Sequence, residues 1–240
     1  MIVRMSAGME ITMKQTDIIN PFQPYMTLEM DGYSQINRTD YGISHFYEFT
    51  IHDEKKHCIK AVPDASIDLL FNIGENKVST YISGTVFGVK KWELGTQDDC
   101  FGVRFQPGQG ILPKDITMEM IVNDDIEIDG DIFGKNLTEK IALAKTMSER
   151  IDIFKKAYED MVLGRNSLSD KEKINEYLVN RISRTKGMIT MRQLEDETNY
   201  SACYLRRIFK SFHGISPKQF AQYIRFQNLL MQADKEGVRY

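Results

Sequence analysis

The residues of this chain best suited to recognising another molecule lie between positions 199 and 220, in the stretch NYSACYLRRIFKSFHGISPKQF. Counted on to Arg225, this part of the chain holds no carboxylate and five cationic side chains: Arg206, Arg207, Lys210, Lys218 and Arg225. The planar guanidinium fork of arginine can meet N7 and O6 of guanine in a major groove, while lysine and serine suit phosphate. The stretch therefore indicates either a nucleic-acid surface or a solvated basic helix without a partner.

The basic stretch belongs to a chain that is acidic as a whole. The 240 residues carry a formal net charge of −3, yet residues 161–240 hold 14 Lys and Arg against 8 Asp and Glu. The remaining residues hold 17 against 26, so the two parts of the chain have different electrostatic partners. A basic module on an acidic body favours a polyanion as the partner of the module.

Helix caps predict two short helices joined by a tight turn. Thr190 and Gln193 form a capping box for a helix over 191–198. Asn199 can take the left-handed conformation of a tight turn, and Ser201 caps the next helix. A short capped helix, a turn of about three residues and a second capped helix make a helix-turn-helix.

The second helix, 201–213, has one apolar face and one cationic face. Apolar residues fall at helical spacing along it: Leu205, Ile208, Phe209 and Phe212. At about 100° per residue, the opposite side carries Cys203, Arg206, Arg207 and Lys210. Because the second helix of this motif is the one presented to a groove, the spacing favours DNA recognition over a solvated face.

A longer helix follows the pair. Gly214 ends the second helix, and Ser216, Pro217 and Gln219 supply the N-cap, the first-turn proline and the capping-box partner of a helix that runs to about Ala233. One face of this last helix is predicted to hold Phe220, Tyr223, Ile224 and Gln227. Phe226 and Leu229 lie well round from that face and are expected to be uncovered.

The segment NYSACYLRRIFKSFHGISPKQFAQYIRFQNLL resembles the first helix-turn-helix and linker helix of the AraC/XylS family of bacterial transcription regulators, over about residues 170 to 232. The resemblance implies that Cys203, Arg206 and Arg207 lie against base edges. It also implies that Ser201, Tyr204 and Lys210 lie on the phosphate side, with Leu205, Ile208, Phe209 and Phe212 in the core.

The sequence departs from the family pattern in two respects. The family normally holds two helix-turn-helix units, and here the sequence stops at Tyr240 after the linker helix, which predicts a truncated module. Glu195 stands where the family usually has a small residue, so it is expected to tilt the first helix or to sit at the rim. The alternative function is therefore a ligand-binding or dimerisation module whose DNA binding is impaired.

The N-terminal half is predicted to be β-rich from about residue 20 to 125, with a hairpin that turns at Gly74, Glu75 and Asn76. PDASIDLLFN (63–72) and GVRFQPGQG (102–110) resemble the sensor domain of one branch of AraC-like regulators. That resemblance implies a role in small-molecule sensing or dimerisation. Asp68, Trp92 and Arg104 are candidate residues of a ligand pocket, because a buried arginine needs an anion; ordinary packing with ion pairing is the alternative.

The expected fold class is α+β, in four parts. Residues 1–17 form a flexible leader, and residues 18–130 form an antiparallel β-rich sensor or dimerisation domain, for which a cupin-like form is one option. Residues 131–165 form a helical connector, with apolar spacing at Leu143, Met147, Ile151, Phe154 and Tyr158. Residues 166–240 form the all-α helix-turn-helix segment.

Several function classes find no support in the sequence. Three distant cysteines make no disulfide framework, and no segment has the length of a membrane span or the core of a signal peptide, which favours the cytoplasm. His45, His52 and His57 do not have the spacing of a metal site, and no catalytic motif is present, so we expect no cofactor and no enzyme. The expected partners are double-stranded DNA, a small-molecule effector, RNA polymerase and a second copy of the chain.

Overall fold

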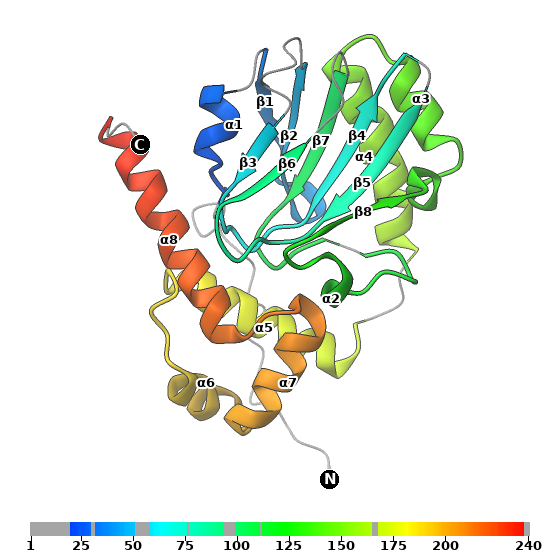
Figure 1. Ribbon diagram of the computed structural model, residues 1–240. Coiled ribbons are helices and arrows are strands. Elements are labelled where there is room, and N and C mark those ends of the chain that lie inside the picture. Colours follow the sequence, from blue (N-terminus) through cyan, green and yellow to red (C-terminus); the bar gives the residue numbers. More distant parts are fainter. Residues whose placement is uncertain are drawn as a thin grey trace.

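The protein is described from a computed structural model that covers residues 20–29, 32–50, 58–75, 77–93, 99–110, 112–164 and 168–237. A β-rich body forms the upper part of the molecule in Figure 1, and a group of helices lies beneath it. The expected α+β class, with an antiparallel β-rich N-terminal part and a helical C-terminal part, is confirmed. None of the helices in the described ranges is long and apolar enough to cross a membrane.

The main sheet has six antiparallel strands in the order β1-β2-β7-β4-β5-β8. Its strands are β1 (Ser34–Asn37), β2 (Ile43–Thr50), β4 (Asp68–Ile73), β5 (Val78–Ser83), β7 (Asp99–Phe105) and β8 (Asp125–Ile128). A second, two-stranded sheet pairs β3 (Cys58–Ala61) with β6 (Lys90–Glu93). The predicted hairpin is confirmed, since Ile73 pairs with Val78 and the Gly74 amide donates to the Lys77 carbonyl at 3.0 Å; Asn76 lies outside the described residues.

Strand alternation gives the main sheet two different buried faces. One face carries large apolar side chains, such as Phe46, Phe71 and Phe101, and is covered by α3 (Leu137–Leu143) and α4 (Met147–Leu163). The other face carries Tyr47 and Phe49, which pack with residues of α1 (Pro24–Glu29). The sheet is therefore the middle layer of the body, with helices behind it and α1 and the small sheet in front of it in Figure 1.

The predicted helical connector is two helices that complete the core of the β-rich body. Thr146 caps α4 with a capping box to Glu149, and the expected residues Met147, Ile151, Phe154 and Tyr158 are buried. Leu143, the first apolar residue of that spacing, is helical as predicted, but its side chain is 73% exposed. Leu143 ends α3, and the extended residue Ala144 separates it from α4, so it does not share the helical phase of Met147.

The C-terminal helices have the caps that the sequence predicts. They are α5 (Asp170–Arg184), α6 (Met191–Thr198), α7 (Ala202–His213) and α8 (Pro217–Lys235). Thr190 and Ser216 each form the predicted capping box, with Gln193 and Gln219 respectively. The helices share a core of their own, to which Ala65 from the β-rich body contributes. Short helical segments elsewhere are α2 (Met118–Ile121), η2 (Asp40–Gly42) and η3 (Gly130–Phe133).

Gly102 in the central strand β7 gives a test of this packing. A Cβ atom at position 102 would lie 2.0–2.5 Å from carbon atoms of the Tyr47 ring, which leaves no room for a methyl group. We therefore expect Gly102→Ala to lower the free energy of unfolding by about 1–3 kcal/mol, as for overpacking of a core. Urea unfolding measures the change.

Gly88→Ala is the matched control, because nothing lies within 4 Å of a Cβ atom at position 88 and the residue is exposed. It is expected to leave the free energy of unfolding nearly unchanged. Equal stability of the two variants would contradict the close packing of the Tyr47 ring on Gly102.

Candidate nucleic-acid interface

Helices α6 and α7 form the predicted helix-turn-helix. Asn199 ends α6 in the left-handed conformation, with φ of 56°, and its amide donates to the Glu195 carbonyl at 2.8 Å. Ser201 caps α7 by accepting a hydrogen bond from the Tyr204 amide at 3.4 Å. The chain therefore turns between the two helices over three residues, as the sequence predicts.

One face of α7 is buried. Leu205, Ile208 and Phe209 are at most 3% exposed and pack in the core that α7 shares with α5 and α8, while Phe212 is partly buried at its edge. Burying three large side chains on one stripe fixes the rotation of α7 about its own axis. The direction in which the remaining side chains point is set by this contact.

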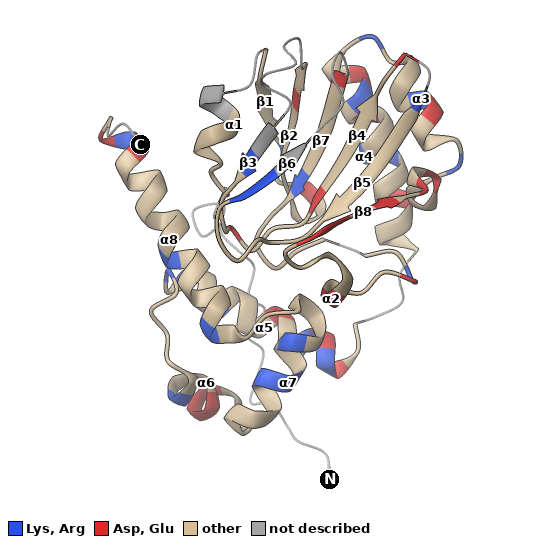
Figure 2. Ribbon diagram, viewed as in Figure 1, with Lys and Arg blue, Asp and Glu red and all other residues tan. Residues whose placement is uncertain are grey.

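The opposite face of α7 carries Cys203, Arg206, Arg207 and Lys210, all exposed as predicted. Figure 2 shows the cations as blue segments on α7 at the lower end of the molecule. Within the described ranges, no carboxylate forms an ion pair with any of these three cations. Arg207 lies over the ring of Tyr204, with Cζ 5.4 Å from the ring centroid. This cation–π contact with Tyr204 helps to position the Arg207 side chain.

Glu195 has a role that the sequence did not reveal. Its Oε1 accepts a hydrogen bond from the Ala202 amide at 2.5 Å, and the side chain is partly buried beside the start of α7. The contact places Glu195 between α6 and the start of α7, and the two expectations, tilting of α6 or a place at the rim, stay predictions. The carboxylate satisfies an amide of the first turn of α7 and is favourably placed at the positive end of the helix dipole.

A second carboxylate fixes α6 to α5. Both oxygens of Glu197 accept from the guanidinium of Arg181, with Nε at 2.8 Å from Oε2, and Tyr177 donates to the same Oε2 at 2.8 Å. The hydrogen bonds from Arg181 hold the pKa of Glu197 below its usual value. The first helix of the pair is thus braced by a charged contact, whereas the second is held by apolar burial.

The C-terminal end of α7 is packed against the β-rich body. Gly214 follows α7 with φ of 65°, and a Cβ atom there would lie 2.7 Å from Cγ2 of Val122, next to α2. His213 is buried, and its Nε2 lies 2.8 Å from Oδ1 of Asn175 in α5. A cavity of about 80 Å³ lies at this junction, lined from both parts by residues that include Met118 and His213.

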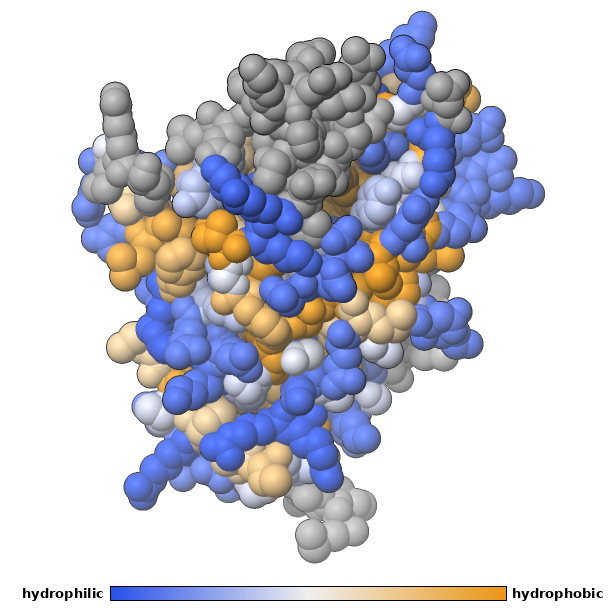
Figure 3. Space-filling view, viewed as in Figure 1, coloured by the Kyte–Doolittle hydropathy of each residue, from blue (hydrophilic) through white to orange (hydrophobic). Residues whose placement is uncertain are grey.

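Helix α8 also contacts both parts. Gln227 is completely buried: its Oε1 accepts from the Phe22 amide at 2.7 Å and its Nε2 donates to the Pro63 carbonyl at 3.0 Å. Phe226 and Leu229 are 40% and 67% exposed, as the helical phase predicts. In Figure 3 hydrophobic residues gather over α8 on the left of the view.

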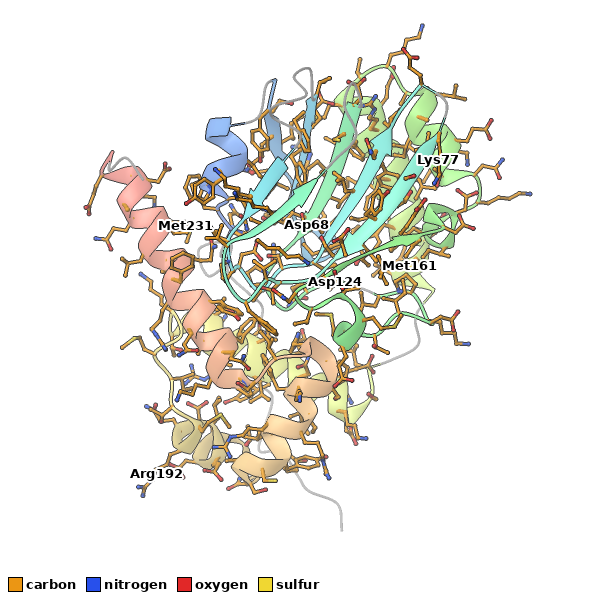
Figure 4. The ribbon with its side chains drawn as sticks, in the orientation of Figure 1. Asp68, Lys77, Asp124, Met161, Arg192 and Met231 are labelled. Carbon is orange, nitrogen blue, oxygen red and sulfur yellow. The ribbon has the colours of Figure 1, made fainter. Side chains whose placement is uncertain are left out.

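The candidate ligand residues Asp68 and Arg104 lie together on the second face of the sheet, where Figure 4 labels Asp68. Arg104 donates from Nε and Nη2 to Asp68 at 2.7–3.0 Å, and Nε lies 3.8 Å from Asp64. Burial opposes the charge of Arg104, but the two aspartates hold its pKa above the usual value. The structure thus provides the anion for Arg104 within the chain; the Trp92 side chain lies outside the described residues.

Of the three histidines considered for metal binding, the structure describes only His45. His45 is buried, and burial and the charge of Arg104 lower its pKa to about 3. His52 and His57 lie outside the described residues. No group of three or more His, Cys, Asp or Glu residues within the described ranges could hold a metal ion.

Comparison with known proteins gives one family match. Residues 41–127 match a family described as Domain of unknown function (DUF6597). The match runs from η2 to β8, so it covers most of the main sheet and ends before α3, α4 and the helix-turn-helix. The chain matches none of the curated proteins and none of the solved structures.

Buried His213 gives a prediction about pH. Burial lowers its pKa to about 3, so between pH 3 and 6.5 the unfolded chain binds a proton that the folded chain does not. The folded state therefore loses stability as the pH falls through this window, by up to about 2 kcal/mol between pH 7 and pH 5. We expect His213→Gln to reduce this loss, measured by urea unfolding at the two pH values.

The comparison with the unsubstituted chain isolates His213, because His45 and the carboxyl groups contribute equally to both proteins. An unfolding free energy that changes with pH in the same way in both proteins would contradict burial of His213 in its neutral form.

Proposed function

We propose that the protein is a sequence-specific DNA-binding transcription regulator whose helix α7 enters the major groove. In this function Cys203, Arg206 and Arg207 face base edges, and Ser201, Tyr204 and Lys210 lie toward phosphates. The observation that carries the proposal is the exposed cationic face of α7, opposite its buried face, on the second helix of a capped pair.

Surface cations elsewhere in the protein form ion pairs, which favours DNA binding by α7 over the alternative of a solvated basic face without a partner. Lys77, Lys155 and Arg181 each form an ion pair with a carboxylate of this chain. Within the described ranges the exposed cations of α7 have no such carboxylate partner, and a row of that kind attracts the phosphates of a duplex. Three unpaired cations on one helical face therefore favour a polyanionic partner.

The β-rich body supports a regulatory role in the same proposal. Its matched domain is known in AraC-like regulators, and it packs directly on the helices that carry the cationic face. The proposal assigns to this body the sensing of a small-molecule effector or the formation of a homodimer, with RNA polymerase as a further partner. Dimerisation would raise DNA affinity, because the second unit binds at a high effective concentration.

The double variant Arg206→Ala with Arg207→Ala tests DNA reading. We expect the wild-type chain to enrich a defined sequence from a pool of random duplexes. Each arginine that reads a base should contribute about 1–3 kcal/mol on the enriched duplex, so the double variant should bind it at least tenfold more weakly. Fluorescence anisotropy at fixed salt measures both affinities.

Lys235→Ala is the matched control, because it removes a cation at the far end of α8 from α7. It should leave the affinity for the enriched duplex nearly unchanged. Equal binding by the double variant and the wild type would overturn the proposal, and failure to enrich any duplex would favour a ligand-binding or dimerisation module.

Glu195 offers a second, opposite test of the same surface. Glutamine can still accept the hydrogen bond from Ala202, but it removes a negative charge beside the proposed phosphate path. We expect Glu195→Gln to tighten binding to non-specific duplex by about two- to fivefold at low salt, with a smaller effect at high salt. An unchanged affinity for non-specific duplex at low salt, with stability also unchanged, would place the DNA away from the start of α7.

A further inference from the structure

A cavity lies far from α7, at the outer edge of the main sheet. A cavity of about 460 Å³ opens between strands β5 and β8 and helix α3. These elements run beside one another on the right of Figure 1, and Figure 4 labels Lys77 just before β5. The volume is in the range of sites for small organic ligands.

The charged groups of the cavity all have one sign. Glu127, Asp129, Asp131 and Glu139 line it, and the described residues of its lining include no lysine or arginine. Backbone amides of residues 136–138, foremost Thr138, hold the pKa of Asp131 below its usual value. Hydrogen bonds from Lys77 and Ser79 do the same for Glu127, so both carboxyl groups are ionised at neutral pH.

A buried hydroxyl group in the cavity has an unused hydrogen-bonding capacity. Thr80 lines the cavity and is only 2% exposed, and its Oγ1 has no hydrogen-bond partner within the described part of the chain. Native structures leave few buried polar atoms in this condition. A Cβ atom at position 130 would lie 2.6 Å from this oxygen, so Gly130 packs directly against the hydroxyl and only a glycine fits there.

The cavity also has an apolar wall. Val78, Ile128, Ala142 and Leu143 line it beside the carboxylates. Leu143, the last residue of α3, is 73% exposed. An exposed leucine next to carboxylates suits a ligand that carries both methylene groups and positive charge.

The distribution of the carboxylates distinguishes between two kinds of cation. Within the described ranges, no three carboxylates converge closely enough to hold a metal ion. Charges spread around an apolar wall instead match a ligand whose positive charges are separated by methylene groups. The buried hydroxyl can accept a hydrogen bond from an ammonium group, which a carboxylate rim then neutralises.

We propose that the cavity between β5, β8 and α3 binds an aliphatic diamine or polyamine, with one ammonium group on Thr80 and others on the carboxylates of Glu127, Asp129, Asp131 and Glu139. The site is independent of DNA binding, so its test does not depend on the function proposed for α7.

Isothermal titration calorimetry of the full chain with 1,4-diaminobutane and with spermidine tests this site. Both should bind more tightly than butylamine, which has one ammonium group, and than Mg²⁺ or Ca²⁺ at matched ionic strength. Thr80→Val keeps the shape of the side chain but removes the hydroxyl, and it should weaken diamine binding about tenfold. Glu139→Gln should weaken it about threefold, as for a partly exposed ion pair.

A control variant and a thermal unfolding measurement accompany the calorimetry. Asp152→Asn removes an exposed carboxylate of α4 outside the cavity and should leave amine binding unchanged. Without ligand, Thr80→Val should unfold at the same temperature as the wild type or higher, because it removes an unsatisfied hydroxyl. Equal amine affinity of Thr80→Val and the wild type, or tighter binding of a divalent metal than of the diamine, would overturn the proposal.

Discussion

The burial of one stripe of α7 is the contact on which the C-terminal part of the structure depends. Leu205, Ile208 and Phe209 enter the core shared with α5 and α8, and helical geometry then sends Arg206, Arg207 and Lys210 outward together. The electrostatic surface is therefore a consequence of apolar packing. No cation on this helix needs a specific contact of its own to point away from the body, because the buried stripe has already fixed the rotation of the helix.

The β-rich body uses a different constraint, in which buried charges must be matched. Arg104 is buried between the main sheet and α1, where the carboxylates of Asp68 and Asp64 compensate the charge of its guanidinium group. Burial raises the pKa of Asp64, while Arg104 opposes that shift. Removing one partner would leave an unpaired charge in a dry environment, so this cluster acts as a unit that specifies how the second face of the sheet is filled.

The sequence predicted what is local and missed what depends on distant neighbours. The capping boxes at Thr190 and Ser216, the turn at Asn199 and the hairpin before Val78 each follow from a few adjacent residues, and the structure confirms them. The exposure of Leu143 was not predictable, because the break between α3 and α4 cannot be recognised from apolar spacing that continues across it. The contact of Glu195 with Ala202 joins two helices, and those of Gln227 with Phe22 and Pro63 span more than 160 residues, so no short pattern carries them.

The two parts of the molecule have separate cores but pack directly against each other, which limits how one could act on the other. Gly214 lies against Val122, and the backbone between α2 and β8 is itself bonded to the end of β5, through Ile121 to Gly84 and through Asn123 to Thr85. Under the proposed function, a ligand on the body could change DNA affinity only by the difference in its affinity for two arrangements of this junction. Tight packing at Gly214 allows few intermediate positions, whereas the cavity beside His213 provides space for a second arrangement. The proposed regulation would therefore require a discrete repacking of α2 against the end of α7, because a gradual bend would have to compress atoms already in contact.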